Sequence, residues 1–179
     1  MVVSVDDPDV HLMLRVQAGE TGAFEKLFAQ YKRPIVNFAR RYLGNMARAE
    51  DAAQETFLRL YRARADYRPE TRFRTYLYRI ATNTCLNHLR KRDWLTREAP
   101  AEPVDTAFAT PEQALQGEEM KARVQKALMA LPESQRTALL LLRFEDMSYE
   151  EIASVMDKTV PAVKALLNRA KEFMVRSLC

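Results

Sequence analysis

The sequence predicts an all-α fold made of two small helical domains joined by an acidic flexible linker, the second domain ending in a helix-turn-helix. The first observation is composition: the 179-residue chain has only four glycines and long stretches rich in Ala, Leu, Arg and Glu, which favour helix. The second is pattern: there are no alternating Val- or Ile-rich runs bounded by turns, so a sheet is not expected. The third is charge: residues 98–120 carry six acidic side chains and no Lys or Arg, between two net basic segments.

The charge segments also indicate what the chain binds. Residues 1–97 carry 18 basic and 11 acidic side chains, and residues 121–179 carry 10 and 7. Two basic modules on either side of an acidic segment indicate nucleic-acid contacts by the modules and not by the segment between them.

Several other classes of protein are disfavoured. No apolar run is long enough to span a bilayer, and the acidic start MVVSVDDPDV is too short for a signal peptide. Cys85 and Cys179 lack the spacing of a metal site or a disulfide framework, and His11 and His88 lack partners at ligand spacing. There is no Gly-rich phosphate loop. We therefore expect a cytoplasmic protein that is not an enzyme, with no cofactor, no metal and no membrane insertion.

The first domain is expected over residues 8–95. A first helix runs from about Pro8 to Gln17 and starts within a run of aspartates, which suit its positive end. A longer helix follows, which Pro34 should kink or interrupt and which Gly44-Asn45 closes in the manner of a C-cap. One face of this helix is apolar. That face consists of Phe24, Leu27, Phe28, Tyr31, Ile35, Phe38, Ala39 and Tyr42.

The third helix, from about Arg48 to Arg64, contains the segment EDAAQETFLRLYRA. Its surface combines two carboxylates, an amide and an aromatic ring, a mixture that suits docking onto a basic partner helix. The patch consists of Asp51, Gln54, Glu55 and Phe57. The alternative is a solvated helix face with Phe57 in the core.

The fourth helix, from about Phe73 to Arg92, contains FRTYLYRIATNTCLNHLRKR. A polar stripe recurs on one of its faces, formed by Arg79, Asn83, Asn87 and Arg90. Around its start, aromatic rings interleave with arginines, which is the chemistry of single-stranded DNA capture, and the loop Asp66–Thr71 offers a pocket for an extruded base. The residues concerned are Tyr67, Arg68, Arg72, Phe73, Arg74, Tyr76 and Tyr78. The alternative places the rings in the core; we expect this for Phe73 and Tyr76, and both interpretations stay open for Tyr67.

The linker is expected over residues 96–118, with a helix starting after Thr110-Pro111, and the second domain over residues 119–179. The first helix of this domain ends at Leu131-Pro132, and another spans about Glu133 to Phe144.

The segment from Ser148 to Lys171 predicts two short helices joined by a turn. Ser148 and Glu151 form a capping box at the first, and Thr159 caps the second, where Pro161 falls in the first turn. This is the outline of a helix-turn-helix, whose second helix can enter a DNA major groove. The alternative is an ordinary pair of helices in a bundle.

Together these segments resemble a bacterial RNA polymerase sigma factor of the sigma-70 family, of the extracytoplasmic-function type. The resemblance runs from about Asp9 to Leu178. The segments EDAAQETFLRLYRA and FRTYLYRIATNTCLNHLRKR resemble the second conserved region of the family. The segment LPESQRTALLLLRFEDMSYEEIASVMDKTVPAVKALLNRAK resembles the fourth.

The resemblance implies a subunit that directs core RNA polymerase to specific promoters and assists melting of the −10 element. It implies contacts with the β′ clamp and the β subunit, the clamp being docked by Asp51, Gln54, Glu55 and Phe57. The −10 element is implied to meet Tyr67, Arg68, Arg72, Tyr76, Arg79, Asn83, Asn87 and Arg90. The −35 element is implied to meet Thr159, Ala162, Lys164, Ala165, Asn168, Arg169 and Lys171. An anti-sigma factor that clamps both domains is implied as a further partner.

The chain departs from the family pattern at three places. Tyr76 stands where the family often has tryptophan, Asp157 lies where the turn glycine is usual, and Ala165-Leu166 replaces a common Ser-Arg. Two other functions remain as alternatives: a stand-alone helix-turn-helix transcriptional regulator, and a sigma-like interaction module without DNA activity.

Overall fold

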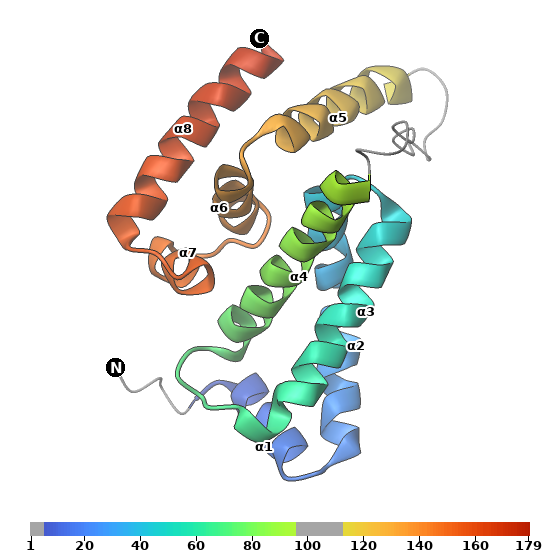
Figure 1. The fold of residues 1–179 in the computed structure, drawn as a ribbon, viewed down its shortest axis with the longest axis vertical. Coiled ribbons are helices and arrows are strands. Elements are labelled where there is room, and N and C mark those ends of the chain that lie inside the picture. Colours follow the sequence, from blue (N-terminus) through green and yellow to red (C-terminus); the bar gives the residue numbers. More distant parts are fainter. Residues whose placement is uncertain (1–5, 96–112) are drawn as a thin grey trace.

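The computed structural model describes the backbone of residues 6–95 and 113–179 and the side chains of residues 6–91 and 117–179. Within these ranges the chain forms eight α-helices, one short 3₁₀ helix and no strand, which confirms the predicted all-α class (Figure 1). The helices are α1 (Pro8–Gln17), α2 (Thr21–Leu43), α3 (Met46–Arg62), η1 (Ala63–Asp66), α4 (Phe73–Leu95), α5 (Gln113–Ala130), α6 (Glu133–Arg143), α7 (Tyr149–Met156) and α8 (Val160–Leu178).

Helices α1 to α4 form one bundle (Figure 1). Asp7 caps α1 by accepting a hydrogen bond from the backbone N–H of Asp9 at 3.0 Å, and it also accepts one from the N–H of Phe73 at 3.0 Å. Asp7 therefore satisfies a backbone N–H in the first turn of α1 and another in the first turn of α4, which links the first and last helices of the bundle.

Helix α2 runs through Pro34 without interruption, so the predicted interruption is wrong. Proline removes a single backbone hydrogen bond, and the buried side chains of Tyr31, Ile35 and Phe38 on either side of Pro34 hold the helix to the core. The C-cap at Gly44 is confirmed: its φ of 71° lies in the left-handed region that glycine tolerates.

Helices α5 to α8 form the second bundle. The start of α5 at Gln113 confirms the predicted helix start after Thr110-Pro111, which lies inside the predicted linker of residues 96–118. Residues 96–112 of that linker lie outside the described residues. The capping box of Ser148 and Glu151 is present at the start of α7, and Thr159 accepts from the N–H of Ala162 at the start of α8. Asp157 adopts φ 52° between them, so an aspartate fills the turn where left-handed backbone is required.

The two bundles pack directly on each other, with α2 and α4 against α5, α6 and α7 (Figure 1). The centre of this contact is Arg136 of α6, which is 5% exposed. Its guanidinium donates to the carbonyl oxygens of Leu128 (2.8 Å), Met129 (2.6 Å) and Leu131 (3.1 Å) at the end of α5. It also donates to the carbonyl of Tyr42 in the last turn of α2 (3.1 Å). One side chain therefore satisfies carbonyls of both domains.

A second contact between the domains is built around a buried carboxylate. Glu145 is 6% exposed, and it accepts hydrogen bonds from the hydroxyl of Tyr78 and the guanidinium of Arg74, both on α4. Burial raises the pKa of Glu145, although hydrogen bonds from Tyr78 and Arg74 act in the opposite direction.

Two further features complete the fold. No helix among the described residues is long and apolar enough to cross a membrane. Cys85 is buried in α4, where desolvation raises the pKa of its thiol to about 12, whereas Cys179 is exposed.

We expect Arg136→Lys to lower the free energy of unfolding by about 3 kcal/mol, because an ammonium cannot replace four directed guanidinium bonds to buried carbonyls. Urea unfolding followed by circular dichroism measures this change. The control is Arg169→Lys on the exposed face of α8, expected to cost less than about 0.5 kcal/mol. Equal effects of the two substitutions would contradict the role of Arg136.

Candidate functional site

The patch predicted on α3 is only partly exposed. Asp51 and Gln54 are exposed and Glu55 is partly buried, but Phe57 is 3% exposed and belongs to the core. The alternative that places Phe57 in the core is therefore correct, and the prediction of an exposed patch is wrong for this residue. Phe57 is buried because it points toward α2, where its ring meets Phe28 edge-on with the centroids 4.9 Å apart.

The sequence analysis missed a groove next to this patch. A cavity of about 660 Å³ lies between α2 and α3, and Phe28, Leu58 and Tyr61 line it while remaining exposed by 36%, 48% and 37%. Exposed apolar side chains gathered in one groove are typical of a surface that a partner helix covers. The signal in the sequence was Phe28, which widens the apolar face of α2 beyond what the core requires.

Glu55 is held in place by two neighbours. Its carboxylate accepts a hydrogen bond from Arg59 at 2.9 Å and forms another with His88 Nε2 of α4 at 2.8 Å. Burial opposes ionisation of this carboxyl, but the hydrogen bonds from His88 and Arg59 outweigh it, and the pKa of Glu55 is lowered. The sequence analysis assigned His88 no partner, because the two residues are 33 positions apart.

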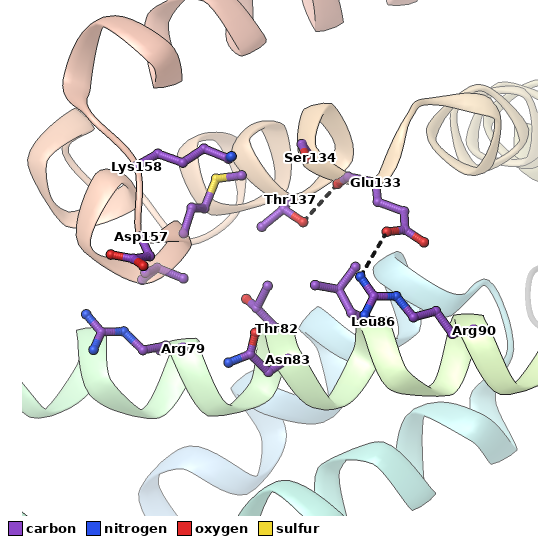
Figure 2. A pocket seen from close by; sticks show the side chains of 12 residues that line it. Arg79, Thr82, Asn83, Leu86, Arg90, Glu133, Ser134, Thr137, Asp157 and Lys158 are labelled. Atoms are coloured by element: carbon purple, nitrogen blue, oxygen red, sulfur yellow. Dashed lines mark hydrogen bonds and ion pairs between the residues drawn. The ribbon is translucent and has the colours of Figure 1, made fainter.

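The polar stripe on α4 faces the second domain. Arg79, Asn83 and Arg90 line a cavity of about 580 Å³ whose opposite wall comes from α6, α7 and the turn after α7 (Figure 2). The remaining member of the stripe, Asn87, is partly buried.

Besides Arg74, which bonds Glu145, three more arginines of the first domain approach the second. Arg79 donates to the carbonyl of Ser154 at 2.7 Å, Arg90 lies 3.9 Å from Glu133, and Arg72 lies 3.9 Å from Glu151. The last two pairs are long and their arginines are largely exposed, so they contribute little free energy. Their geometry still means that the stripe faces protein in this arrangement of the domains.

The aromatic residues before and in α4 pack against protein. Tyr67 is 3% exposed and meets Tyr76 edge-on with the centroids 5.0 Å apart, while Phe73 is fully buried. The core interpretation is therefore correct for Phe73, and the structure also favours it for Tyr67. Desolvation raises the pKa of Tyr67, whose hydroxyl has no hydrogen-bond partner among the described residues. Arg68, next to it, is exposed.

The outer face of α8 gathers the residues of the predicted second DNA surface. The exposed members are Thr159, Lys164, Ala165, Asn168, Arg169 and Lys171, and Ala162 is partly buried. The inner face, with Val163, Leu167 and Ala170, is buried against the domain. Leu166 stands where the family that the sequence resembles often has an arginine. In this chain it is partly buried and packs against the hydrophobic core.

The surfaces of the described residues have the character of binding surfaces. Among the described residues, no group of three His, Cys, Asp or Glu side chains could hold a metal ion. What the site presents is an apolar groove beside carboxylates on α2 and α3, a polar stripe on α4, and a basic outer face on α8.

Comparisons with known proteins agree with this division. Residues 27–95 match the family model of Sigma-70 region 2, and residues 121–174 match that of Sigma-70, region 4. The chain is 36% identical to the RNA polymerase sigma-H factor of Pseudomonas aeruginosa, over 96% of this chain and 94% of that protein. It is 34% identical to the ECF RNA polymerase sigma-E factor of Escherichia coli K12, over 92% and 91% of the two chains.

Solved structures show the same fold. CnrH, solved in complex with the cytosolic domain of CnrY, superposes with a TM-score of 0.72 at 26% identity, covering 97% of each chain. The sigma factor RpoE of Bartonella quintana, solved with the anti-sigma factor NepR, superposes with a TM-score of 0.69 at 21% identity, covering 87% of this chain and 96% of that one.

We expect Glu55→Gln to lower the free energy of unfolding by about 0.5–1 kcal/mol at neutral pH, because it removes a partly exposed ionised partner of His88 and Arg59. A lowered carboxyl pKa stabilises the fold above the unfolded-state pKa of about 4.3, and this contribution is lost as the pH falls through the folded-state pKa. The difference between the two proteins should therefore shrink below about pH 4.

Urea unfolding at a series of pH values measures this difference. The matched control is Glu50→Gln, an exposed glutamate on the same helix, which should change the free energy of unfolding by less than about 0.5 kcal/mol. A difference for Glu55→Gln that persists undiminished at low pH would rule out the ionised carboxylate as its source.

Proposed function

The chain belongs to the sigma-70 family, in its extracytoplasmic-function type, and we propose how its two domains divide the work of a sigma factor. As a sigma factor it directs core RNA polymerase to specific promoters in transcription initiation. We assign residues 8–95 to polymerase docking and the −10 element, residues 96–118 to the linker, and residues 119–179 to the −35 element.

Docking on the β′ clamp of core polymerase uses α3. Asp51 and Gln54 are exposed there, and Glu55 is fixed in orientation by His88 and Arg59. The groove between α2 and α3 adds apolar contacts from Phe28, Leu58 and Tyr61, since interfaces gain most of their energy from buried apolar anchors with charges at the rim. Phe57 acts from beneath, by supporting Phe28.

The −10 element meets α4 and the loop before it. The stripe of Arg79, Asn83, Asn87 and Arg90 supplies cations for phosphates and amides for bases, with Arg68 and Arg72 as exposed cations upstream. Asn83 and Arg90 are exposed but lie across the cavity from the second domain, and Arg79 is bonded to Ser154 of that domain. A promoter strand that contacts the whole stripe therefore requires the second domain to move away from α4. Tyr67 and Tyr76 would stack on a base only after the loop has rearranged.

The −35 element meets the outer face of α8 in the major groove. Lys164, Arg169 and Lys171 suit phosphates, and Asn168 suits a base edge. Thr159 lies at the N-terminal end of α8, and Ala162 and Ala165 lie on its first turns. A recognition helix enters the major groove through this end and this face. The second domain also contacts the β subunit of the polymerase.

Three further properties follow from membership in the family. The chain acts without catalysis of its own, as sigma factors are regulators of transcription. It works in the cytoplasm, where polymerase and DNA are. An anti-sigma factor regulates it by binding both domains; the support is that the similar RpoE was solved with an anti-sigma factor.

The observation that carries the proposal is that one chain holds two DNA-type faces on separate domains, the stripe of α4 and the outer face of α8. Run-off transcription with core polymerase tests it: the chain should make transcription depend on a promoter that has both elements. No promoter-dependent transcript from any cognate promoter would contradict the proposal.

Reversing the charge of the docking patch should weaken the complex with polymerase. We expect Glu55→Lys to lower the affinity for core polymerase by about tenfold or more, because it places a cation where a basic partner is proposed and removes the partner of His88. Fluorescence anisotropy of labelled protein measures this affinity. Glu172→Lys on α8 is the control with the same charge change and should bind core polymerase normally; an unchanged affinity of Glu55→Lys would refute the docking role.

Asn83 should matter most while the −10 element is still paired. We expect Asn83→Ala to reduce run-off from a duplex promoter by about tenfold, since it removes an amide next to the bases, and to matter much less on a pre-melted template. The comparison of the two templates is the measurement. Asn37→Ala on α2 serves as control, and equal losses on both templates would exclude a role in opening.

A further inference from the structure

Two side chains at the ends of α1 hold the loop before α4. Gln17 donates hydrogen bonds from Nε2 to the carbonyl oxygens of Ala65 at 3.0 Å and of Tyr67 at 3.1 Å. Asp7 accepts a hydrogen bond from the backbone N–H of Phe73 at 3.0 Å. The loop is therefore attached to α1 where it starts and where it ends.

Helix α1 is itself fixed to the first bundle. Its side chains Val10, Met13 and Val16 are buried, and the helix lies where α3 ends and α4 begins (Figure 1). Gln17 is the last residue of α1 and directly follows Val16. Because Gln17 is carried by a packed helix, its two hydrogen bonds restrain the loop relative to the whole bundle.

The loop pays a cost for the form in which it is held. Tyr67 is 3% exposed, and its hydroxyl has no hydrogen-bond partner among the described residues. Other buried tyrosines have one: Tyr31 bonds Asp9, Tyr42 bonds Thr137 and Tyr78 bonds Glu145. A hydroxyl that is buried without a partner destabilises this form of the loop relative to one in which the hydroxyl reaches water.

Two opposing contributions therefore act on Tyr67. The edge-on contact of its ring with Tyr76, the bonds from Gln17 and the bond to Asp7 favour the buried position. The unpaired hydroxyl favours an outward position. A segment balanced in this way can change its conformation when a ligand binds only one of the two forms.

We propose that Gln17 is a latch for the loop before α4. Its hydrogen bonds keep Tyr67 buried, and the loop opens when Tyr67 turns outward to stack on a base of the −10 strand. This inference rests on the proposed function, which assigns Tyr67 to the −10 element. Gln17 is a positioning residue, because it acts on the strand through the loop and not by touching DNA.

The latch predicts opposite effects for two substitutions. If only the open loop stacks on a base, the apparent affinity for the strand is reduced by the fraction of molecules that are open. Gln17→Met keeps the length of the side chain and removes the donor, so the open fraction should rise. Tyr67→Phe keeps the ring and removes the unpaired hydroxyl, so the open fraction should fall.

Hydrogen exchange of the full chain without polymerase tests the latch directly. We expect the backbone amides of residues 65–73 to exchange about fivefold faster in Gln17→Met and severalfold slower in Tyr67→Phe. Gln30→Met is the matched control, since Gln30 of α2 also bonds α1 through its amide, donating to Asp9 at 3.0 Å. It should leave exchange in the loop unchanged. Unaltered exchange in Gln17→Met, or faster exchange in Tyr67→Phe, overturns the proposal.

Binding of the −10 strand by the holoenzyme tests the functional consequence. The probe is a labelled single-stranded oligonucleotide with the non-template −10 segment of a promoter on which the chain supports run-off, and fluorescence anisotropy measures its affinity. We expect binding about threefold to tenfold tighter for Gln17→Met, weaker by a similar factor for Tyr67→Phe, and unchanged for Gln30→Met. The affinity for core polymerase should be equal in all of them, whereas general damage to the fold would lower it.

The two possible failures are distinguishable. Equal or weaker binding of the strand by Gln17→Met, with normal binding by the unaltered holoenzyme, overturns this inference and leaves the sigma function standing. Absence of binding by the unaltered holoenzyme refutes the assignment of the −10 element to this domain, and the role of the latch in promoter binding falls with it.

Discussion

The arrangement of the two domains depends on one buried guanidinium. The last carbonyls of a helix have no partner within that helix, and both α5 and α2 end at the contact between the domains. Arg136 satisfies carbonyls of both ends, and the neighbouring Thr137 lies 2.6 Å from the hydroxyl of the same Tyr42 whose carbonyl Arg136 binds. Tyr42 is thus held at its backbone and at its side chain by consecutive residues of α6. These contacts hold α6 against the end of α2, and the cavity lined by α4, α6 and α7 lies beside them.

Helix α4 is the element that all the surfaces share. Its buried face completes the first bundle, His88 reaches back to Glu55 on α3, and its polar stripe faces the second domain. A displacement of α4 is therefore transmitted in two directions. In the proposed function, docking on α3 and movement of the second domain would both involve this helix, because His88 of α4 bonds Glu55 while Arg79 and Asn83 of α4 line the cavity toward the second domain.

How much of the fold and of the candidate site could be predicted from the sequence depends on how far apart in the chain the interacting residues lie. Helices, caps and turns are local, so the capping box at Ser148 and the bounds of α1 were predictable from spacing alone. The outer face of α8 was predictable for the same reason. Other features depend on contacts between residues far apart in the chain. They are the bond between Glu55 and His88, the burial of Phe57 and Tyr67, and the unpaired hydroxyl of Thr82. No periodicity records such contacts, and they decide which predicted site residues are accessible.

The placement of the two cysteine thiols has a consequence for oxidation. Thiolates, not thiols, react with peroxides and alkylating agents, and the buried Cys85 with its raised pKa remains a thiol at neutral pH. Cys179, by contrast, is exposed just beyond the end of α8. Oxidation to a mixed disulfide with glutathione or with a second chain is therefore open to the thiol of Cys179, while the thiol inside α4 stays untouched.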